Sequence, residues 1–175
     1  MITTSLTVDF NGIVLFDPER LKQYFGGQIA AGTNVYRLMT TTQAGDDVLT
    51  QGIVVPIMGI NDSTYEVILR TSDEPSPVAE QTIVSNGVFP LQVTGRLVLA
   101  DMAVLHEWEA ELGWQTLPVE PGCYAVTLHG FRFIADHRVQ RFGFDIEIES
   151  RVNLPALTGR LDTHMQVLEL PVEAY

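Results

Sequence analysis

The chain has 175 residues, of which 22 are acidic and 10 are basic, so its formal net charge is −12 at pH 7. A negative surplus of this size repels phosphate, which excludes general nucleic-acid binding and favours a basic protein as partner. Cys123 is the single cysteine, so neither an intrachain disulfide nor a paired-cysteine zinc site can form. No apolar run approaches the roughly 18 residues that a membrane span needs, and residues 1–10 lack the basic start of a signal peptide, so we expect a cytoplasmic protein of the bacterial type with no membrane partner.

Short segments in which apolar and polar residues alternate predict strands along the whole chain. In chain order these segments are 5–10, 12–16, 35–39, 53–57, 65–69, 82–89, 95–99, 124–128, 131–134, 142–149 and 165–170. Turn pairs such as Asn11-Gly12 and Asn86-Gly87 separate them. About ten short strands with turns between them are typical of an all-β, mainly antiparallel fold. We expect a single two-sheet β-sandwich or jelly-roll-like domain over residues 1–175.

Two short helices are expected to interrupt the strands. The first, at 17–26, begins with an Asp-Pro pair that suits the N-cap and the first helical position, and it ends on glycine. The second, at about 101–112, places Leu105, Trp108 and Leu112 on one apolar face and its glutamates on the other. The apolar face of this second helix predicts packing against the core rather than a ligand site.

The two helices belong to an order of elements that occurs twice. In each case a strand ends in aspartate, a short helix ends on glycine, a proline follows, and a Y-x-V-x-L strand begins at Tyr65 or Tyr124. This order predicts an internal pseudo-duplication with halves 1–87 and 88–175. Residues 27–52 form an extra segment in the first half.

Familiar catalytic and cofactor-binding patterns are missing from the sequence. It has no nucleophile elbow, no P-loop, no dinucleotide-binding glycine pattern and no His-Glu-x-x-His. His106, His129, His137 and His164 show no H-x-H or H-x-x-x-H spacing, which would place two metal ligands together. We therefore expect no catalytic residues, no metal site and no cofactor. The alternative is an acid–base pair of Asp162 and His164 on one strand face.

Two groups of charged residues are the candidate binding residues. They are Asp145, Glu147 and Glu149 on one predicted strand, and Arg132, Arg138 and Arg141 just before it. The carboxylates alternate with apolar residues, which predicts an acidic stripe that either is solvated or meets an arginine-rich partner. The arginines flank a predicted turn, so they either pair across the hairpin with the acidic stripe or bind a small anion or carboxylate.

The segment Ala103–Arg132 carries a likeness to a known family. It has an acidic short helix, then Gly-Trp, then L-P-V-x-P-G-x-Y-x-V-x-L-H-G from Leu117 to Gly130. This order resembles the closing half of small bacterial β-sandwich proteins of the competence nuclease-inhibitor (ComJ-like) and toxin-immunity kind. The resemblance implies a non-catalytic acidic inhibitor that blocks the basic surface of a nuclease, and it transfers no binding residue.

Three functions compete on these observations. The sequence favours a non-catalytic, acidic protein-binding or inhibitor module of a bacterial cytoplasm, with an exposed acidic or aromatic patch. The first alternative is a small-ligand-binding or hydrolytic enzyme on a β-sandwich, with His129, His164 and Asp162 as its polar groups. The second alternative is a structural or assembly subunit. The oligomeric state stays open, with a homodimer among the options.

Overall fold

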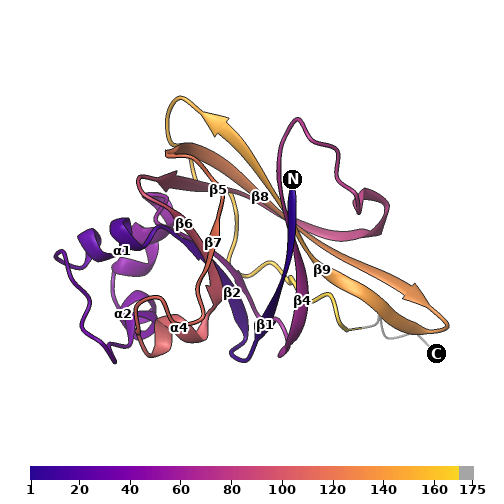
Figure 1. Cartoon of the computed structure of the whole chain (residues 1–175), viewed down its shortest axis with the longest axis horizontal. Coiled ribbons are helices and arrows are strands. Elements are labelled where there is room, and N and C mark those ends of the chain that lie inside the picture. Colours follow the sequence, from indigo (N-terminus) through magenta and orange to yellow (C-terminus); the bar gives the residue numbers. More distant parts are fainter. Residues whose placement is uncertain (170–175) are drawn as a thin grey trace.

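Two β-sheets dominate the computed structural model, which describes residues 1–169 (Figure 1). The five-stranded sheet has the order β1-β4-β9-β8-β5 and the bounds β1 Ile2–Val8, β4 Ser63–Thr71, β5 Thr82–Val93, β8 Gly122–Ala135 and β9 Arg138–Arg151. The four-stranded sheet has the order β3-β2-β6-β7 and the bounds β2 Gly12–Phe16, β3 Val54–Met58, β6 Leu97–Asp101 and β7 Gln115–Leu117. Strand pairs are antiparallel except β4–β9, which is parallel. The prediction of a mainly-β, antiparallel-rich fold is confirmed.

Four α-helices and one 3₁₀ turn connect the strands within residues 1–169. They are α1 Pro18–Tyr24, α2 Val35–Thr41, α3 Ala44–Thr50, α4 Ala103–His106 and η1 Ala79–Gln81. The prediction of α1 is confirmed, and Asp17 caps it by accepting from the backbone N–H groups of Glu19 and Arg20. No helix in this part of the chain has both the length and the apolar character needed to cross a membrane.

The segment 27–52 differs from its prediction. Residues 35–39 were expected to form a strand, and they belong to α2. Asn34 begins this helix, because its side chain accepts from the backbone N–H of Arg37 at 2.8 Å, as N-cap residues do. Since α3 follows almost at once, the segment adds a helical pair beside the four-stranded sheet, and the protein has more helices than the two expected.

The second predicted helix is also shorter than expected. α4 ends at His106, because the backbone of Trp108 pairs with the segment 27–34 instead of continuing the helix. The Trp108 N–H donates to the Thr33 carbonyl at 3.0 Å, and the Trp108 carbonyl accepts from the Gly32 N–H at 2.8 Å. Trp108 is buried as predicted, whereas Leu112 lies outside the apolar face and is 62% exposed.

Two hydrophobic clusters hold these layers together. The larger one contains residues of both sheets, such as Tyr65, Phe144 and Val126 from the five-stranded sheet with Leu15 and Leu99 from the four-stranded sheet. The smaller one joins the other face of the four-stranded sheet to the helices. Its members include Val14, Phe16, Val54 and Val98 from the sheet and Leu21, Val35, Val48, Leu105 and Trp108 from the segments around the helices. Because both faces of this sheet are buried, β2 and β6 appear in the sequence as continuous apolar runs.

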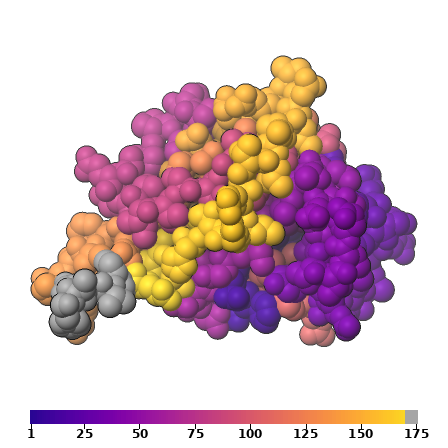
Figure 2. Space-filling model, turned by 180° about the vertical axis from the view of Figure 1, so that it is seen from behind, coloured from indigo at the N-terminus to yellow at the C-terminus, as the bar shows by residue number. Residues whose placement is uncertain are grey.

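The segment 152–169 crosses the back of the molecule after β9 (Figure 2). The prediction of a strand at 165–170 is wrong for residues 165–169, which form no strand ladder, and residue 170 lies outside the described residues. Met165 and Val167 nevertheless insert into the larger cluster. The backbone N–H groups of Thr158 and Gly159 both donate to the Val88 carbonyl, so this segment fastens to β5.

Gly143 marks the close approach of β9 to its parallel neighbour β4. A Cβ atom at Gly143 would lie 1.9 Å from the carbonyl oxygen of Glu66, which the strand ladder holds in place. Gly143→Ala is therefore expected to lower the free energy of unfolding by about 1–3 kcal/mol, measured by urea denaturation. Gly95→Ala is the matched control, because its Cβ would meet only the Glu19 side chain at 3.7 Å. Equal losses in both variants would contradict the steric explanation.

Candidate functional site

The predicted acidic stripe on β9 is only partly a surface feature. Asp145 is fully buried, whereas the side chains of Glu147 and Glu149 are 29% and 46% exposed. The outer face of the sheet is covered beside Asp145, because Val78 from the segment 72–81 packs on Ile68 of β4 and Phe131 of β8. The expectation of one continuous exposed stripe is therefore wrong at Asp145.

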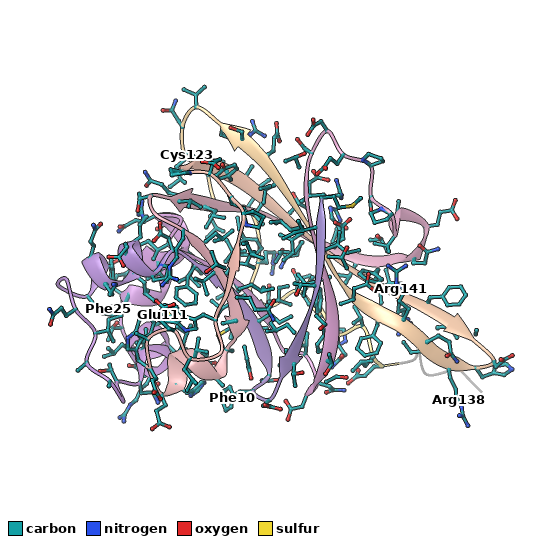
Figure 3. All side chains as sticks on the ribbon, in the orientation of Figure 1. Phe10, Phe25, Glu111, Cys123, Arg138 and Arg141 are labelled. Atoms are coloured by element: carbon teal, nitrogen blue, oxygen red, sulfur yellow. The ribbon has the colours of Figure 1, made fainter. Side chains whose placement is uncertain are left out.

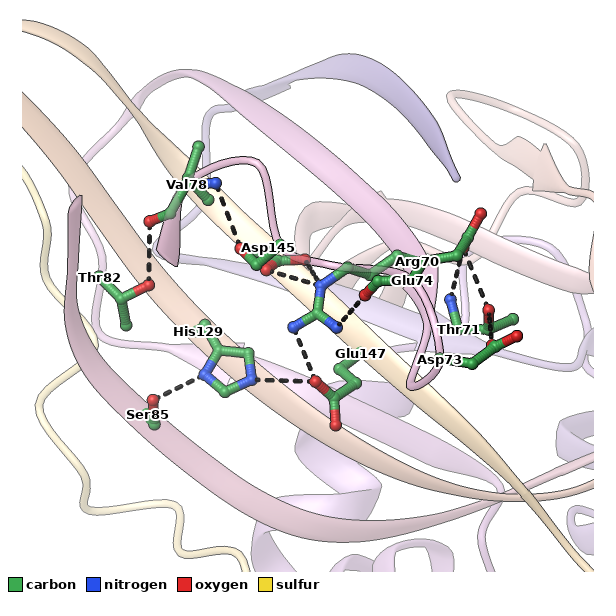
Figure 4. A network of polar contacts seen from close by, with 11 residues as sticks. Arg70, Thr71, Asp73, Glu74, Val78, Thr82, Ser85, His129, Asp145 and Glu147 are labelled. Carbon is green, nitrogen blue, oxygen red and sulfur yellow. Dashed lines mark hydrogen bonds and ion pairs between the residues drawn. The ribbon is translucent and has the colours of Figure 1, made fainter. Parts of the chain in front are cut away.

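Arg70 of β4 neutralises this part of the sheet (Figure 4). Its Nε lies 3.0 and 2.9 Å from the two carboxylate oxygens of Asp145, and its Nη2 lies 2.7 Å from Glu147 Oε2. Nη1 also donates to the carbonyl of Glu74 at 3.0 Å, which ties down the segment 72–81. Burial alone would lower the pKa of Arg70, but the hydrogen bonds and negative charges of Asp145 and Glu147 outweigh burial and raise this pKa. No pattern in the sequence pointed to Arg70, because its partner Asp145 lies 75 residues away along the chain.

His129 of β8 extends the same network toward the surface. Its Nδ1 lies 2.7 Å from Ser85 Oγ, and its Nε2 lies 3.8 Å from Glu147 Oε2 (Figure 4). A serine, an imidazole and a carboxylate in sequence are the parts of a hydrolytic relay. Here Arg70 already binds the carboxylate, and the buried Nε2 has no hydrogen-bond partner among residues 1–169. This network of side chains links β5, β8, β9 and β4. Within it, the Ser85–His129 contact combines a hydroxyl group with a base.

The predicted basic group lies on the end of the β8–β9 hairpin. β5 last pairs with β8 at Phe131, and β4 first pairs with β9 at Gly143, so residues 132–142 form a two-stranded arm. Figure 3 shows Arg138 near the tip of this arm, and no ion pair within residues 1–169 involves it. Phe133 and Ile134 on the arm are 49% and 43% exposed.

The other two arginines of this group do not pair with the acidic stripe. Arg141 binds Glu66 of β4 at 2.5 Å and lies over the ring of Phe131. Arg132 donates to the backbone carbonyls of Val167 and Glu169. The expected cross-strand pairing is wrong, because the register of the hairpin places aromatic residues rather than carboxylates opposite both arginines.

The histidines do not gather into a site. Within the described residues, no group of three or more His, Cys, Asp or Glu side chains is placed to hold a metal ion. Asp162 binds Arg160 at 2.7 Å and His164 lies 3.8 Å from Glu169, both outside any strand, so the acid–base pair proposed for Asp162 and His164 is not formed. Cys123 is a half-buried free thiol.

A second acidic surface lies between the end of β1 and α4. It is a groove of about 350 Å³, which we call the acidic groove. It is lined by Leu6, Thr7, Asp9, Asp101, Ala103, Val104, Glu107, Glu109, Leu112 and Gly113. Asp101 fixes one wall, because its carboxylate accepts from the backbone N–H groups of Asp9 at 2.8 Å and Ala103 at 3.1 Å.

The acidic groove carries unneutralised charge beside exposed apolar side chains. No ion pair within residues 1–169 involves Asp9, Glu107 or Glu109. Leu112 in the groove is 62% exposed, and Phe10, which follows the groove residue Asp9 in the chain, is 42% exposed. Free carboxylates around exposed apolar side chains are a suitable contact surface for a basic protein. This groove was not identified from the sequence. The available signal was the Glu-x-Glu pattern of Glu107 and Glu109, whose side chains were expected to face outward.

An aromatic stack lies next to the acidic groove. The ring of His106 lies 3.8 Å from that of Phe10 and 4.3 Å from that of Tyr36, measured between ring centroids. Burial lowers the pKa of His106, and the negative charge of Asp101 opposes this shift only in part. At neutral pH His106 is therefore an uncharged member of the stack, and it adds no positive charge beside the groove.

Comparisons with known proteins place the fold but no family. No protein-family model matches the sequence, and no curated protein is significantly similar to it. Among solved structures, the chain is similar to ComJ of Bacillus subtilis, an inhibitor of the DNA-degrading activity of NucA, with a TM-score of 0.52 and 9% identity over 86% of this chain and 96% of that chain. It is also similar to the crocagin biosynthetic gene J protein, with a TM-score of 0.48 and 18% identity over 86% of this chain and 95% of that chain. The ComJ-like resemblance of the sequence is confirmed at the level of fold.

Proposed function

We propose that this protein is a non-catalytic binding module of the inhibitor type, which docks a basic protein in its acidic groove. The observation that carries the proposal is a set of three carboxylates, Asp9, Glu107 and Glu109, that form no ion pair within residues 1–169 and lie around the exposed side chain of Leu112. The fold shared with ComJ supports an inhibitor role, because ComJ acts on a nuclease.

Charge and apolar surface have separate tasks in such a complex. The net charge of −12 attracts a basic partner over a distance and speeds association, with an effect that salt weakens. At contact, Leu112 and Phe10 supply the apolar area that excludes water, and the groove carboxylates meet lysine or arginine side chains. A nuclease presents basic residues to DNA phosphates, so a protein bound there would prevent DNA from approaching.

Neutralising the acidic groove is expected to weaken partner binding by about tenfold or more. The test variant is Asp9→Asn with Glu107→Gln and Glu109→Gln. The control variant, Glu80→Gln with Glu120→Gln and Asp73→Asn, removes the same charge from exposed positions outside the groove. Each protein is used to capture its partner from source cells, and the dissociation constant for the purified partner is then measured at low and high salt.

The two variants distinguish local recognition from total charge. The proposal predicts that the wild type and the control variant bind one basic protein in a fixed ratio, and that the groove variant loses it. Equal loss in both variants would show that only net charge matters. Equal binding by all three would place the interface elsewhere, and recovery of this chain alone would favour a structural or assembly subunit.

The β8–β9 arm and the end of β9 are proposed as a second contact surface. It comprises the residues that the sequence singled out and that reach solvent: Arg138, Arg141, Glu147 and Glu149, with Arg132 bound at the base of the arm. The exposed Phe133 supports this role, because an aromatic side chain on a projecting hairpin is a common anchor in protein interfaces. The cytoplasmic location of the protein stays a prediction.

The Ser85–His129 contact supports a second candidate function, a hydrolytic enzyme. A serine-reactive fluorophosphonate probe distinguishes the two candidates. Labelling of the native protein that is lost in Ser85→Ala would favour hydrolysis over binding. The binding proposal predicts no labelling, because the Glu147 carboxylate is bound by Arg70. At 3.8 Å from His129 Nε2, this carboxylate is too far away to hydrogen-bond and orient the imidazole ring.

We also propose that residues 1–175 form one β-sandwich domain with an internal duplication. Strands β1–β4 and β2–β3 pair in the first half as β5–β8 and β6–β7 pair in the second, and β2–β6 joins the halves. Two aspartates in equivalent places support this proposal: Asp17 follows β2, and Asp101 ends β6. Each accepts a hydrogen bond from the backbone just before the strand of the other half. Asp17 accepts from the backbone N–H of Thr94 before β6, and Asp101 accepts from that of Asp9 before β2. Superposition of the halves without residues 27–52 tests it, and failure to overlay α1 on α4 would contradict it.

A further inference from the structure

A second cavity shares none of its lining residues with the acidic groove. It has a volume of about 430 Å³ and separates α2 and α3 from β3 of the four-stranded sheet. We call it the methionine pocket, because three methionines line it: Met39 from α2, Met58 from β3 and Met102 from the junction of β6 and α4. The volume lies within the range of roughly 300–1,000 Å³ that small-molecule sites occupy in proteins.

The inner wall of the methionine pocket is apolar. Val48 and Val54 are 2% and 3% exposed and Met102 is 4% exposed, so they form the floor. Methionine side chains are flexible and polarizable, and they adapt to apolar ligands of irregular shape. Leu161 from the segment 152–169 is 49% exposed and also lines the pocket, which places it at the rim. Segment 152–169 and the helical region lie next to each other in Figure 2.

The polar groups of the pocket define one charged end. The hydroxyl groups of Thr40 and Thr42 donate to helix carbonyls, including that of Leu38 at 2.6 Å from Thr42. Among the described lining residues, Asp46 is the only one with a charged side chain, and no ion pair within residues 1–169 involves it. Asp46 is exposed at the start of α3, so its negative charge lies where the apolar interior meets solvent.

We propose that the methionine pocket binds a small apolar molecule that carries one amino or ammonium group. The apolar body would occupy the floor between α2, α3 and β3, and the cation would pair with Asp46 at the rim. Charge decides against an anionic amphiphile such as a fatty acid, because both Asp46 and the net charge of −12 repel it. This site is independent of the acidic groove and does not rest on the proposed function.

Calorimetric titration with octylamine, octanoate and octanol tests the proposal. These three probes share one apolar chain and differ in charge. Octylamine is expected to bind to one site with a dissociation constant about fivefold below those of the other two. In Asp46→Asn this preference is expected to fall to about twofold, while octanol binding stays unchanged because the apolar floor is intact.

Three further variants complete the experiment. Asp136→Asn removes the same charge from the distant hairpin turn and is expected to keep the full preference for octylamine. Leu161→Trp fills the rim and Met58→Trp fills the pocket, and each is expected to weaken the binding of all three probes. Two such variants are used so that the test still stands if one of them misfolds. Equal binding of octylamine and octanoate, an unchanged preference in Asp46→Asn, or no binding of any probe would each overturn the proposal.

Discussion

Replacement of Arg70 by methionine is expected to lower the free energy of unfolding by about 3–5 kcal/mol. The side chains of Arg70 and Asp145 are 6% and 1% exposed, so the variant leaves a carboxylate buried without its cation. It also removes the hydrogen bond to the Glu74 carbonyl, which holds the segment 72–81 over the sheet. Urea denaturation at pH 7 measures the loss, provided that the free energy of unfolding falls with urea at the same slope in the wild type and in Arg70→Met.

Removal of both charges is expected to restore most of this stability. In Arg70→Met with Asp145→Leu, neither member of the pair is left uncompensated, and two apolar side chains occupy the buried space. The double variant is therefore expected to be more stable than Arg70→Met alone, with a coupling energy of about 1.5–3 kcal/mol in the double-mutant cycle. An additive loss would show that the two side chains act independently.

Arg141→Met provides the matched control for this experiment. Arg141 pairs with Glu66 on the same sheet, but the two side chains are 49% and 24% exposed. Exposed ion pairs contribute about 0–1 kcal/mol, so a loss of this size is expected, and salt should reduce it further. If Arg70→Met also costs less than about 1 kcal/mol, burial does not give this pair its importance.

Strands were predictable here wherever a single face is buried. Alternation in β9 identified its inward residues. The apolar runs of β2 and β6 were predicted as strands, but the covering of the second face of their sheet by helices was not. The parallel β4–β9 pairing was not predictable, because it joins strands that lie 75 residues apart, as the Arg70–Asp145 contact shows. The helix over Val35–Thr41 was missed because its short apolar run also fits a strand. Its Asn34 cap was the signal that decides between them.

The candidate sites were less predictable than the strands, for a physical reason. Asp145 alternates with apolar neighbours and so has the pattern of a solvated residue, but its burial depends on Val78 from a different segment. Similarly, α4 stops where the carbonyl of Thr33 replaces an intrahelical partner of Trp108. Local pattern gives the direction of a side chain, whereas its exposure depends on segments that pack on it later in the fold.

Replacement of Asp17 by alanine is expected to lower the free energy of unfolding by about 2–4 kcal/mol. The fully buried carboxylate caps α1 through Oδ1, and through Oδ2 it accepts from the Thr94 N–H at 2.6 Å and the Gly95 N–H at 3.0 Å. The variant leaves these N–H groups without an acceptor at the junction of β5 and β6. Asp101→Ala, which loses two backbone hydrogen bonds at a half-buried position, is expected to lose only about 1 kcal/mol.

Dependence on pH separates the charge of Asp17 from its shape. Burial by itself would raise the pKa of Asp17, but the hydrogen bonds from Gly95, Thr94 and Glu19 outweigh burial and lower this pKa below 3.8. A lowered pKa in the folded state means that the carboxylate contributes its full stabilisation above about pH 4 and loses it as the pH falls through the folded-state value. The stability deficit of Asp17→Asn should therefore be full at pH 7 and shrink below pH 3.8. A deficit of the same size at pH 7 and pH 2.5 would show that the amide fails through its geometry, and that the charge of Asp17 does not stabilise the junction between the two sheet halves.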